Sequence, residues 1–288
     1  MKESQFYETL SNDAVRCDVC ARHCHVKEGA LGACNVRKNI EGTLYALNYG
    51  IVPARSVDPI EKKPIVHFMR GTRAYSIGSP GCNMTCGWCQ NIELVRARGF
   101  DNPLFEMSAR EVVDRALKAG AQSIAYTYSE PTIFLEFAQD VMHLSKEAGL
   151  RNIWVSNGLM STQSLEAILP YVDAANIDLK GPDNAFYKKH CGGSVDVVLR
   201  NIQRLIEAGV HTEVTSLVIP GENDSLWAFE TMIDHMRAFA TMETPWHITR
   251  FFPAHTMEHL DPTPIASLKT FTTLIQNAGF TRVHLGNV

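Results

Sequence analysis

From Ala74 onward, short β-branched or apolar runs alternate with longer segments whose apolar residues recur at helical spacing. We expect strands at 74–79, 123–128, 152–157, 174–179, 212–219, 246–251 and 282–287. We expect helices near 108–119, 133–148, 162–169, 194–208, 224–240 and 264–278. This alternation predicts an α/β fold with a parallel sheet and right-handed crossovers. Periodicity alone leaves open whether the sheet is doubly wound or forms an open or closed barrel.

Polar and turn-forming residues fall at or just after the ends of these predicted strands. They are Ser129 and Glu130, Ser156 and Asn157, Asp178 and Lys180, Pro220 and Gly221, and residues 253–255. The carboxyl ends of parallel strands form the rim at which barrels and open α/β sheets bind their ligands. The sequence therefore predicts a ligand site at this rim, although each residue alone could instead cap a helix or form a turn.

Composition narrows the classes of partner and compartment. Lys and Arg total 27 against 31 Asp and Glu, so the net charge of -4 shows no basic excess for a phosphate backbone. We expect no nucleic-acid partner. No stretch approaches the roughly 20 apolar residues of a membrane span, and the N-terminus lacks a signal-peptide pattern. We therefore expect a cytoplasmic protein without a membrane partner, in which grouped cysteines indicate metal or redox chemistry rather than disulfides.

Three of the eight cysteines lie in one short loop after the first predicted strand, SPGCNMTCGWCQN. Cys82, Cys86 and Cys89 suit three corners of a 4Fe-4S cluster and leave the fourth iron without a protein ligand. S-adenosylmethionine (SAM) can chelate that iron through its amino and carboxylate groups. One electron then cleaves SAM to methionine and a 5′-deoxyadenosyl radical. A zinc knuckle is the alternative, but zinc normally takes four protein ligands.

Four further cysteines, Cys17, Cys20, Cys24 and Cys34, lie in residues 1–45, where no apolar run is long enough for a core. Four thiols could close a tetrahedral zinc site that folds this segment, or could hold a second iron–sulfur cluster. We therefore predict a Cys-rich metal-binding module at 1–45. A covering segment or linker at 46–73, rich in Pro and mixed charge, follows it, and the α/β domain spans 74–288.

The segment SIGSPGCNMTCGWCQN resembles the signature of radical SAM enzymes of the pyruvate formate-lyase activating type. More closely, the chain from about Val15 onward is similar to the radical SAM component of the AmmeMemoRadiSam system. The segments that match in order are YTYSEPT, VSNG, NIDLKG, FYKKHCGG, VIPGEND and WHITRFFP. The resemblance implies a partial (β/α)6 TIM-type barrel and reductive SAM cleavage at a 4Fe-4S cluster. It also implies an electron donor such as flavodoxin or ferredoxin, and either a protein substrate or the companion proteins of that system.

Carried over residue by residue, the resemblance implies that Cys82, Cys86 and Cys89 bind the cluster and that Trp88 packs on the adenine of SAM. The remaining implied SAM contacts are Ser129, Glu130 and Pro131 at the methionine amino group, Ser156 and Asn157 at the carboxylate and ribose, Asp178 and Lys180 on the next strand end, and Val218, Pro220 and His255 at the adenine.

Cys191 follows a helical FYKKH segment and precedes two glycines, so we expect it to face the cavity. A thiol there could donate a hydrogen atom or hold an intermediate, or could be a small buried hydrophobe. The sequence does not name a substrate. A glycyl residue on a partner protein is one alternative, and a non-catalytic iron–sulfur or zinc scaffold is another.

Overall fold

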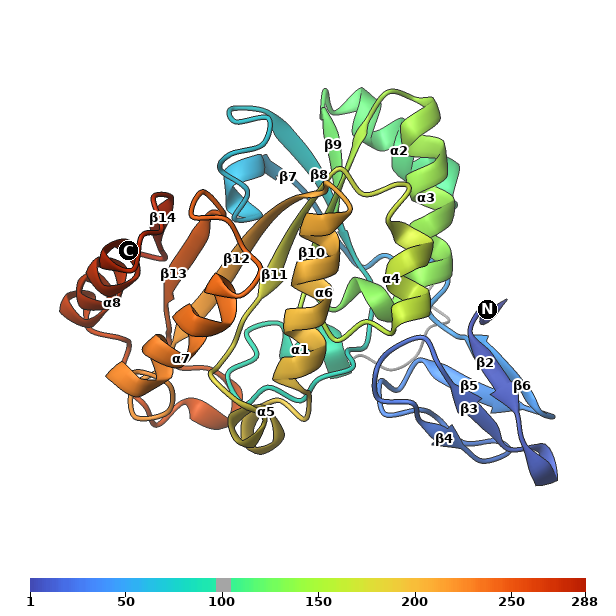
Figure 1. Ribbon diagram of the computed structural model, residues 1–288. Helices are drawn as coiled ribbons and strands as arrows, with labels where there is room; N and C mark the ends of the chain where they lie inside the picture. The colour runs from blue at the N-terminus through green and yellow to red at the C-terminus, as the bar shows by residue number, and fades with distance from the viewer. Residues whose placement is uncertain (97–104) are drawn as a thin grey trace.

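The computed structural model describes residues 1–96 and 105–288, and its centre is an eight-stranded sheet (Figure 1). Seven strands are parallel, and strands that are consecutive in the chain pair with each other. They are β8 (Arg73–Gly78), β9 (Ser123–Tyr126), β10 (Arg151–Ser156), β11 (Ala174–Asp178), β12 (His211–Val218), β13 (Trp246–Arg250) and β14 (Val283–Gly286). Because the strand order never reverses, the winding is that of a barrel and not of a doubly wound sheet. All seven predicted strands are confirmed.

In the part of the chain that the structure describes, six longer helices connect the parallel strands and pack around the outside of the sheet (Figure 1). They are α2 (Ala109–Lys118), α3 (Leu135–Glu147), α4 (Thr162–Ile168), α6 (Val195–Glu207), α7 (Leu226–Arg237) and α8 (Ile265–Asn277), with α1 (Ile92–Arg96) and α5 (Asn184–His190) as shorter additions. Side chains of Ser108, Ser161 and Ser225 cap α2, α4 and α7. The result is six β/α units followed by β14. Within the described ranges, no helix combines the length and apolarity needed to cross a membrane.

The edge of the sheet beyond β8 is β7 (Ala54–Pro59), which runs antiparallel to β8. We expected residues 46–73 to form a covering segment or linker and not a core element, so this strand is a difference from the sequence analysis. The reason is that its residues, ARSVDP, contain one large apolar side chain, and the strand is only half-buried. Backbone pairing with β8 defines such a strand, and its sequence shows little alternation of apolar and polar residues from which it could be predicted.

Residues 1–46 form two small antiparallel sheets that pack on the barrel domain. One contains β1 (Lys2–Glu3), β6 (Thr43–Ala46) and β5 (Arg37–Ile40), and the other contains β2 (Tyr7–Thr9), β3 (Val15–Cys17) and β4 (His25–Val26). Val15, Val26, Val36 and Leu44 are buried in the same hydrophobic cluster as the barrel domain. The expectation that this segment lacks a core is therefore wrong, because its apolar residues are dispersed in sequence and gathered only by tertiary packing.

A buried ion pair fastens this N-terminal part to α3. The Arg37 guanidinium donates to both carboxylate oxygens of Glu136, each at 2.7 Å, and their side chains are 1 % and 2 % exposed. A further donor bond reaches Ser4 Oγ at 2.6 Å, and another reaches the Ile133 carbonyl at 3.0 Å. Paired in this way, two buried charges hold a specific docking geometry.

Residues 60–69 pack on the inner side of the sheet, near the amino ends of the strands. Ile60 and Ile65 are fully buried in a small cluster with alanines and an isoleucine from β8 to β11. The buried carboxylate of Glu213, on β12, accepts hydrogen bonds from the backbone N–H groups of Val66 and His67 at 2.9 and 2.8 Å. This segment, which we call the floor segment, closes the end of the barrel opposite the predicted ligand rim.

Candidate active site

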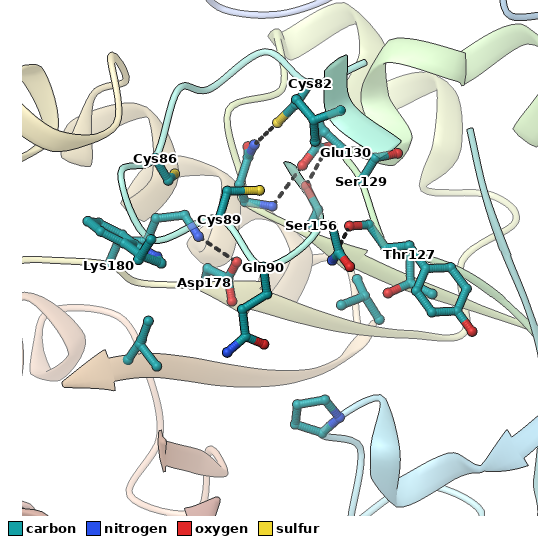
Figure 2. A pocket seen from close by; sticks show the side chains of 18 of the residues that line it. Cys82, Cys86, Cys89, Gln90, Thr127, Ser129, Glu130, Ser156, Asp178 and Lys180 are labelled. Carbon is teal, nitrogen blue, oxygen red and sulfur yellow. Dashed lines mark hydrogen bonds and ion pairs between the residues drawn. The ribbon is translucent and has the colours of Figure 1, made fainter. Parts of the chain in front are cut away.

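A cavity of about 370 Å³ lies at the carboxyl ends of β8 to β12, the rim at which the sequence predicts a ligand site (Figure 2). It is lined by Lys62, Lys63, Pro64, Cys82, Cys86, Trp88, Cys89, Gln90, Asn91, Val95, Thr127, Tyr128, Ser129, Glu130, Val155, Ser156, Asn157, Asp178, Lys180 and Leu217. The three cysteines, the three strand-end polar pairs and Trp88 thus meet at one place, although they are spread over about one hundred residues of sequence.

The cysteine loop follows β8 and is fixed by close packing on both sides. Gly81 has a φ of +98°, and a methyl group on it would come within 2.8 Å of the Cys34 carbonyl oxygen, so only glycine fits there. The backbone N–H of Met84 donates to Cys82 Sγ at 3.4 Å, and the N–H of Thr85 donates to the Cys191 carbonyl at 2.9 Å. Figure 2 shows Cys82, Cys86 and Cys89 turned toward the same cavity.

Glu130 joins the ends of β9 and β10. Its Oε1 accepts from the Thr132 N–H at 3.0 Å, the Thr132 hydroxyl at 2.5 Å and the Ser156 hydroxyl at 2.8 Å, while Oε2 accepts from the Asn157 N–H at 2.8 Å. The side chain is buried, and this burial raises the pKa of Glu130 even though the four donors favour the ionised form. Glu130 therefore positions the backbone and hydroxyl that face the cavity.

Asn157 and Asn83 continue this network to the cysteine loop. The Asn157 side-chain amide donates to Asn83 Oδ1 at 2.8 Å and lies 3.7 Å from Cys82 Sγ. Both asparagines are buried. Hydrogen bonds therefore join Cys82, the first cysteine of the loop, to the ends of β9 and β10. They hold Cys82 in place without any metal ligand from another strand.

Lys180 and Asp178 form a charged pair at the end of β11. Lys180 Nζ donates to Asp178 Oδ2 at 2.7 Å, with the lysine side chain 11 % exposed and the aspartate 38 % exposed. Burial lowers the pKa of Lys180, but the nearby Asp178 and the Cys86 and Cys191 thiols outweigh it and raise the pKa well above its usual value. A permanent positive charge therefore stands beside Cys86.

Aromatic side chains also line the cavity. Trp88 is buried, with its ring 6.1 Å from that of Phe186 and 6.2 Å from that of His190, centroid to centroid. Lys63 comes from the floor segment, donates to Asp58 at 3.0 Å and lies 4.9 Å from the centroid of the Tyr128 ring. The cavity thus combines an aromatic side chain with several polar groups, a combination typical of small-molecule and cofactor sites.

The donor set of the loop fits a 4Fe-4S cluster. Three thiols from one loop line the cavity, two N–H donors point to Cys82 Sγ, and Lys180 supplies a positive charge that offsets the negative charge of thiolate ligands. Within residues 1–96 and 105–288, no three or more His, Cys, Asp or Glu side chains form a group that would hold a metal ion.

Four of the predicted SAM contacts, Pro131, Val218, Pro220 and His255, are not among the described lining residues of the cavity. Side chains alternate along a strand, and on β12 it is Leu217 that lines the cavity, whereas Val218 is fully buried on the other side. His255 contacts Arg96 instead, at 3.3 Å between ring and guanidinium nitrogens.

Cys191 does not face the cavity, so that expectation is wrong. Its side chain is fully buried and is not among the described lining residues. Interaction of the Cys86 and Cys191 thiols lowers the pKa of Cys86 and raises the pKa of Cys191. The helix that precedes Cys191, α5, ends at His190 and turns the side chain inward, which spacing from a strand does not predict.

Sequence reasoning missed a group of lining residues from the floor segment, from α1, from β10 and β12, and from the loops. They are Lys62, Lys63, Pro64, Gln90, Asn91, Val95, Thr127, Tyr128, Val155 and Leu217. Thr127 and Tyr128 directly precede Ser129 and could have been found by extending the strand-end argument by two residues. The lysines of 60–69 had no such signal, because only the tertiary fold brings that segment under the rim.

The four N-terminal cysteines line a second, separate cavity together with Val19, Arg22, Gly32, Arg37, Asn83 and Ile133. Cys17, Cys20 and Cys34 are buried and Cys24 is half-buried. Burial raises the pKa of the Cys17 and Cys20 thiols to about 12 each. The structure thus brings together the four cysteines that sequence spacing grouped, at a place where β3, β4 and the cysteine loop meet.

Comparison with known proteins agrees with this architecture. Residues 76–233, more than half of the chain, match the model of the Radical SAM superfamily. The chain is 40% identical over 288 residues to the uncharacterized protein MJ0808 of Methanocaldococcus jannaschii, which covers 100% of this chain and 86% of that protein.

Two solved structures share the fold. A radical SAM methyltransferase from Sphaerobacter thermophilus is similar with a TM-score of 0.57 and 16% identity, over 77% of this chain and 68% of that one. A domain of pyruvate-formate lyase-activating enzyme from Bacteroides vulgatus is similar with a TM-score of 0.51 and 16% identity, over 58% of this chain and 100% of that one.

Proposed function

Because this chain belongs to the radical SAM superfamily, we propose that it cleaves SAM reductively and uses the resulting 5′-deoxyadenosyl radical to abstract hydrogen from a substrate. The observation that carries the proposal is the convergence of Cys82, Cys86 and Cys89 with the polar ends of β9, β10 and β11 on one cavity. A 4Fe-4S cluster bound by these thiols would supply the electron that splits the sulfonium. The protein's own task is to bind, orient and shield SAM.

The residues present assign distinct roles around the cofactor. Trp88 offers the flat apolar surface on which an adenine packs, as the family resemblance implies. Ser129, Ser156 and Asn157 present hydroxyl, amide and backbone groups at the rim for the methionine and ribose parts of SAM. Glu130 acts through Ser156 and Asn157 as a positioning residue, since its own oxygens are already occupied by four donors.

Asp178 and Lys180 complete the polar wall. Asp178 keeps more than a third of its side chain exposed, so its carboxylate can accept hydrogen bonds from ribose hydroxyls. Lys180 stays protonated beside Cys86 and stabilises negatively charged thiolate ligands. Asp178→Asn should weaken SAM binding while leaving iron content unchanged, whereas Lys180→Met should lower iron content.

We place the protein in the AmmeMemoRadiSam branch, with a cytoplasmic location and an electron donor of the flavodoxin or ferredoxin class. The motifs from YTYSEPT to WHITRFFP support this placement. The substrate then is a small molecule or a protein side chain, and activation of a glycyl residue on a partner protein is the alternative. A persistent glycyl radical signal in a partner, seen by electron paramagnetic resonance (EPR), would favour the alternative.

Anaerobic reconstitution with iron and sulfide, followed by dithionite and SAM, tests the proposal. Wild-type protein should release methionine and 5′-deoxyadenosine, and the Cys82→Ala, Cys86→Ala, Cys89→Ala triple variant should release neither while keeping its circular dichroism spectrum. Absence of both products from iron-loaded wild-type protein would leave only the non-catalytic scaffold. Cys191→Ser addresses the catalytic role of that thiol, because unchanged turnover would end it.

A further inference from the structure

The second cavity, which the four N-terminal cysteines line, is distinct from the cavity of the proposed SAM site. Cys17 ends β3, Cys24 directly precedes β4, and the Cys17 N–H donates to the Cys24 carbonyl at 2.9 Å. Cys20 forms an antiparallel bridge with Met160, on the loop after β10. Four thiols from separate turns therefore face one enclosed space between the N-terminal sheets and the barrel domain.

An orphaned donor points to a ligand in this cavity. Arg37 lines it, and its side chain is only 1 % exposed. Both of its terminal nitrogens are engaged by Glu136, Ser4 and Ile133, but its Nε has no hydrogen-bond partner. A buried N–H without an acceptor is costly, and thiolate or sulfide sulfur would satisfy it. The one partner that Arg37 lacks is therefore an acceptor inside the four-cysteine cavity.

The cavity shares a wall with the loop that carries Cys82. Asn83 lines it and directly follows Cys82, and the backbone carbonyl of Asn83 accepts a hydrogen bond from Arg22. Gly81, on the other side of Cys82, approaches Cys34 so closely that a methyl group would be 2.8 Å from the Cys34 carbonyl oxygen. Of the two neighbours of Cys82, Asn83 thus lines the four-cysteine cavity and Gly81 packs against the backbone of Cys34.

We propose that Cys17, Cys20, Cys24 and Cys34 bind an iron–sulfur cluster through which electrons enter the protein. Two observations favour a cluster over a structural zinc ion. The cavity shares Asn83 with the loop that carries Cys82, which places a redox centre there next to the proposed site of SAM cleavage. The N-terminal segment also has its own buried Val15, Val26, Val36 and Leu44, so its fold does not depend on a metal for a core.

The position of this centre defines its use. Half-buried Cys24 lies between exposed His23 and His25, so a redox protein can approach this side of the molecule. A cluster held here would accept one electron from a low-potential protein donor of the flavodoxin or ferredoxin class. It would pass that electron to the site at Cys82, whose neighbour Asn83 lines the cavity, with no bond or proton changing place. This transfer role rests on the proposed function, whereas the presence of the cluster does not.

The triple variant that lacks Cys82, Cys86 and Cys89 tests the cluster directly, because it keeps the N-terminal site intact. After anaerobic reconstitution it should hold about four iron and four sulfide per chain, where wild type holds about eight. Dithionite should give it an EPR signal of a reduced cluster. Zinc in place of iron, or no metal at all in a folded variant, would overturn the proposal. Neither result requires SAM cleavage. Whether the proposed function fails is determined separately, by assaying wild-type protein for methionine and 5′-deoxyadenosine.

A second variant tests the part that Arg37 plays. Arg37→Lys keeps the charge opposite Glu136 but removes the Nε donor, and a hydrogen bond to cluster sulfur stabilises the reduced state. The midpoint potential of the N-terminal cluster in the triple-variant background should therefore become more negative at equal iron content. An unchanged potential would contradict the assignment of Nε to cluster sulfur.

The transfer role is tested with two reductants. In Cys20→Ala, SAM cleavage driven by reduced flavodoxin should fall at least tenfold, while cleavage driven by dithionite should be retained, because a small reductant can reach the Cys82 site directly. Equal loss with both reductants, or no loss with either, would overturn the transfer role. Circular dichroism of this variant shows whether it has folded.

Discussion

Replacement of Glu130 by Gln isolates one hydrogen bond at the centre of the site. The amide oxygen can keep the three donors that Oε1 receives from Thr132 and Ser156, but the amide nitrogen would then face the Asn157 N–H, now 2.8 Å from Oε2. A charge-assisted bond is lost and two donors oppose each other, which costs about 3 kcal/mol. Burial raises the pKa of Glu130, which means that the buried charge itself lowers the stability of the folded protein. Removing this charge therefore offsets part of the free-energy cost.

We therefore expect a net loss of about 2 kcal/mol in the free energy of unfolding, roughly a thirtyfold change in the folding equilibrium. Urea unfolding of the apoprotein at pH 7 measures it. Glu230→Gln is the matched control, since Glu230 is exposed on α7 and should change the value by less than about 0.5 kcal/mol. The variant should also bind SAM more weakly, because Asn157 moves. Equal stability of the two variants would refute the positioning role of Glu130.

Three further predictions concern the elements around the site. Glu136→Gln leaves the buried charge of Arg37 without its partner, so the free energy of unfolding should fall by about 3–5 kcal/mol in urea titrations; a loss below about 1 kcal/mol would contradict this. Gly81→Ala should lower the melting temperature and the iron content together, because a methyl group meets the Cys34 carbonyl; unchanged iron loading would show that the loop can move aside. Burial would raise the pKa of Glu213, but hydrogen bonds from two histidines and two backbone N–H groups lower it to about 2. The ionised carboxylate therefore contributes about 3 kcal/mol to the free energy of unfolding. This contribution is complete above pH 5 and is lost as the pH falls toward 2. The stability difference between wild-type apoprotein and Glu213→Gln should shrink between pH 6 and pH 3, and a constant difference would disprove the ionised state.

Sequence patterns were sufficient for elements whose signal is local. The parallel strands and the cysteine loop were placed within one or two residues, because strand alternation and ligand spacing are local properties. The direction in which strand-end residues point was less accessible. Leu217 lines the cavity and the next residue, Val218, does not, because neighbouring side chains on a strand point to opposite faces. Glu130 points inward because Ser156 and Asn157, at the end of β10, donate hydrogen bonds to its oxygens.

Long-range packing accounts for what was missed in the N-terminal half. Nothing in the local sequence of β7 marks it as a strand, since pairing with β8 defines it. Arg37 and Glu136 are ninety-nine positions apart, and each resembles an ordinary surface residue until the other is placed beside it. The same is true of Lys63, which enters the cavity only because Ile60 and Ile65 anchor the floor segment on the sheet.

The floor segment has a mechanical consequence for the cavity above it. Ile60 and Ile65 fill the inner side of the sheet, Lys62 and Lys63 between them line the ligand cavity, and Val66 is tied to Glu213. The residues that pack on the sheet and the residues that line the cavity are thus neighbours in one short segment. A change of side-chain volume at the foot of the barrel reaches the cavity lysines directly, so the affinity of the site for its ligands can be adjusted from its far end without touching any residue at the rim.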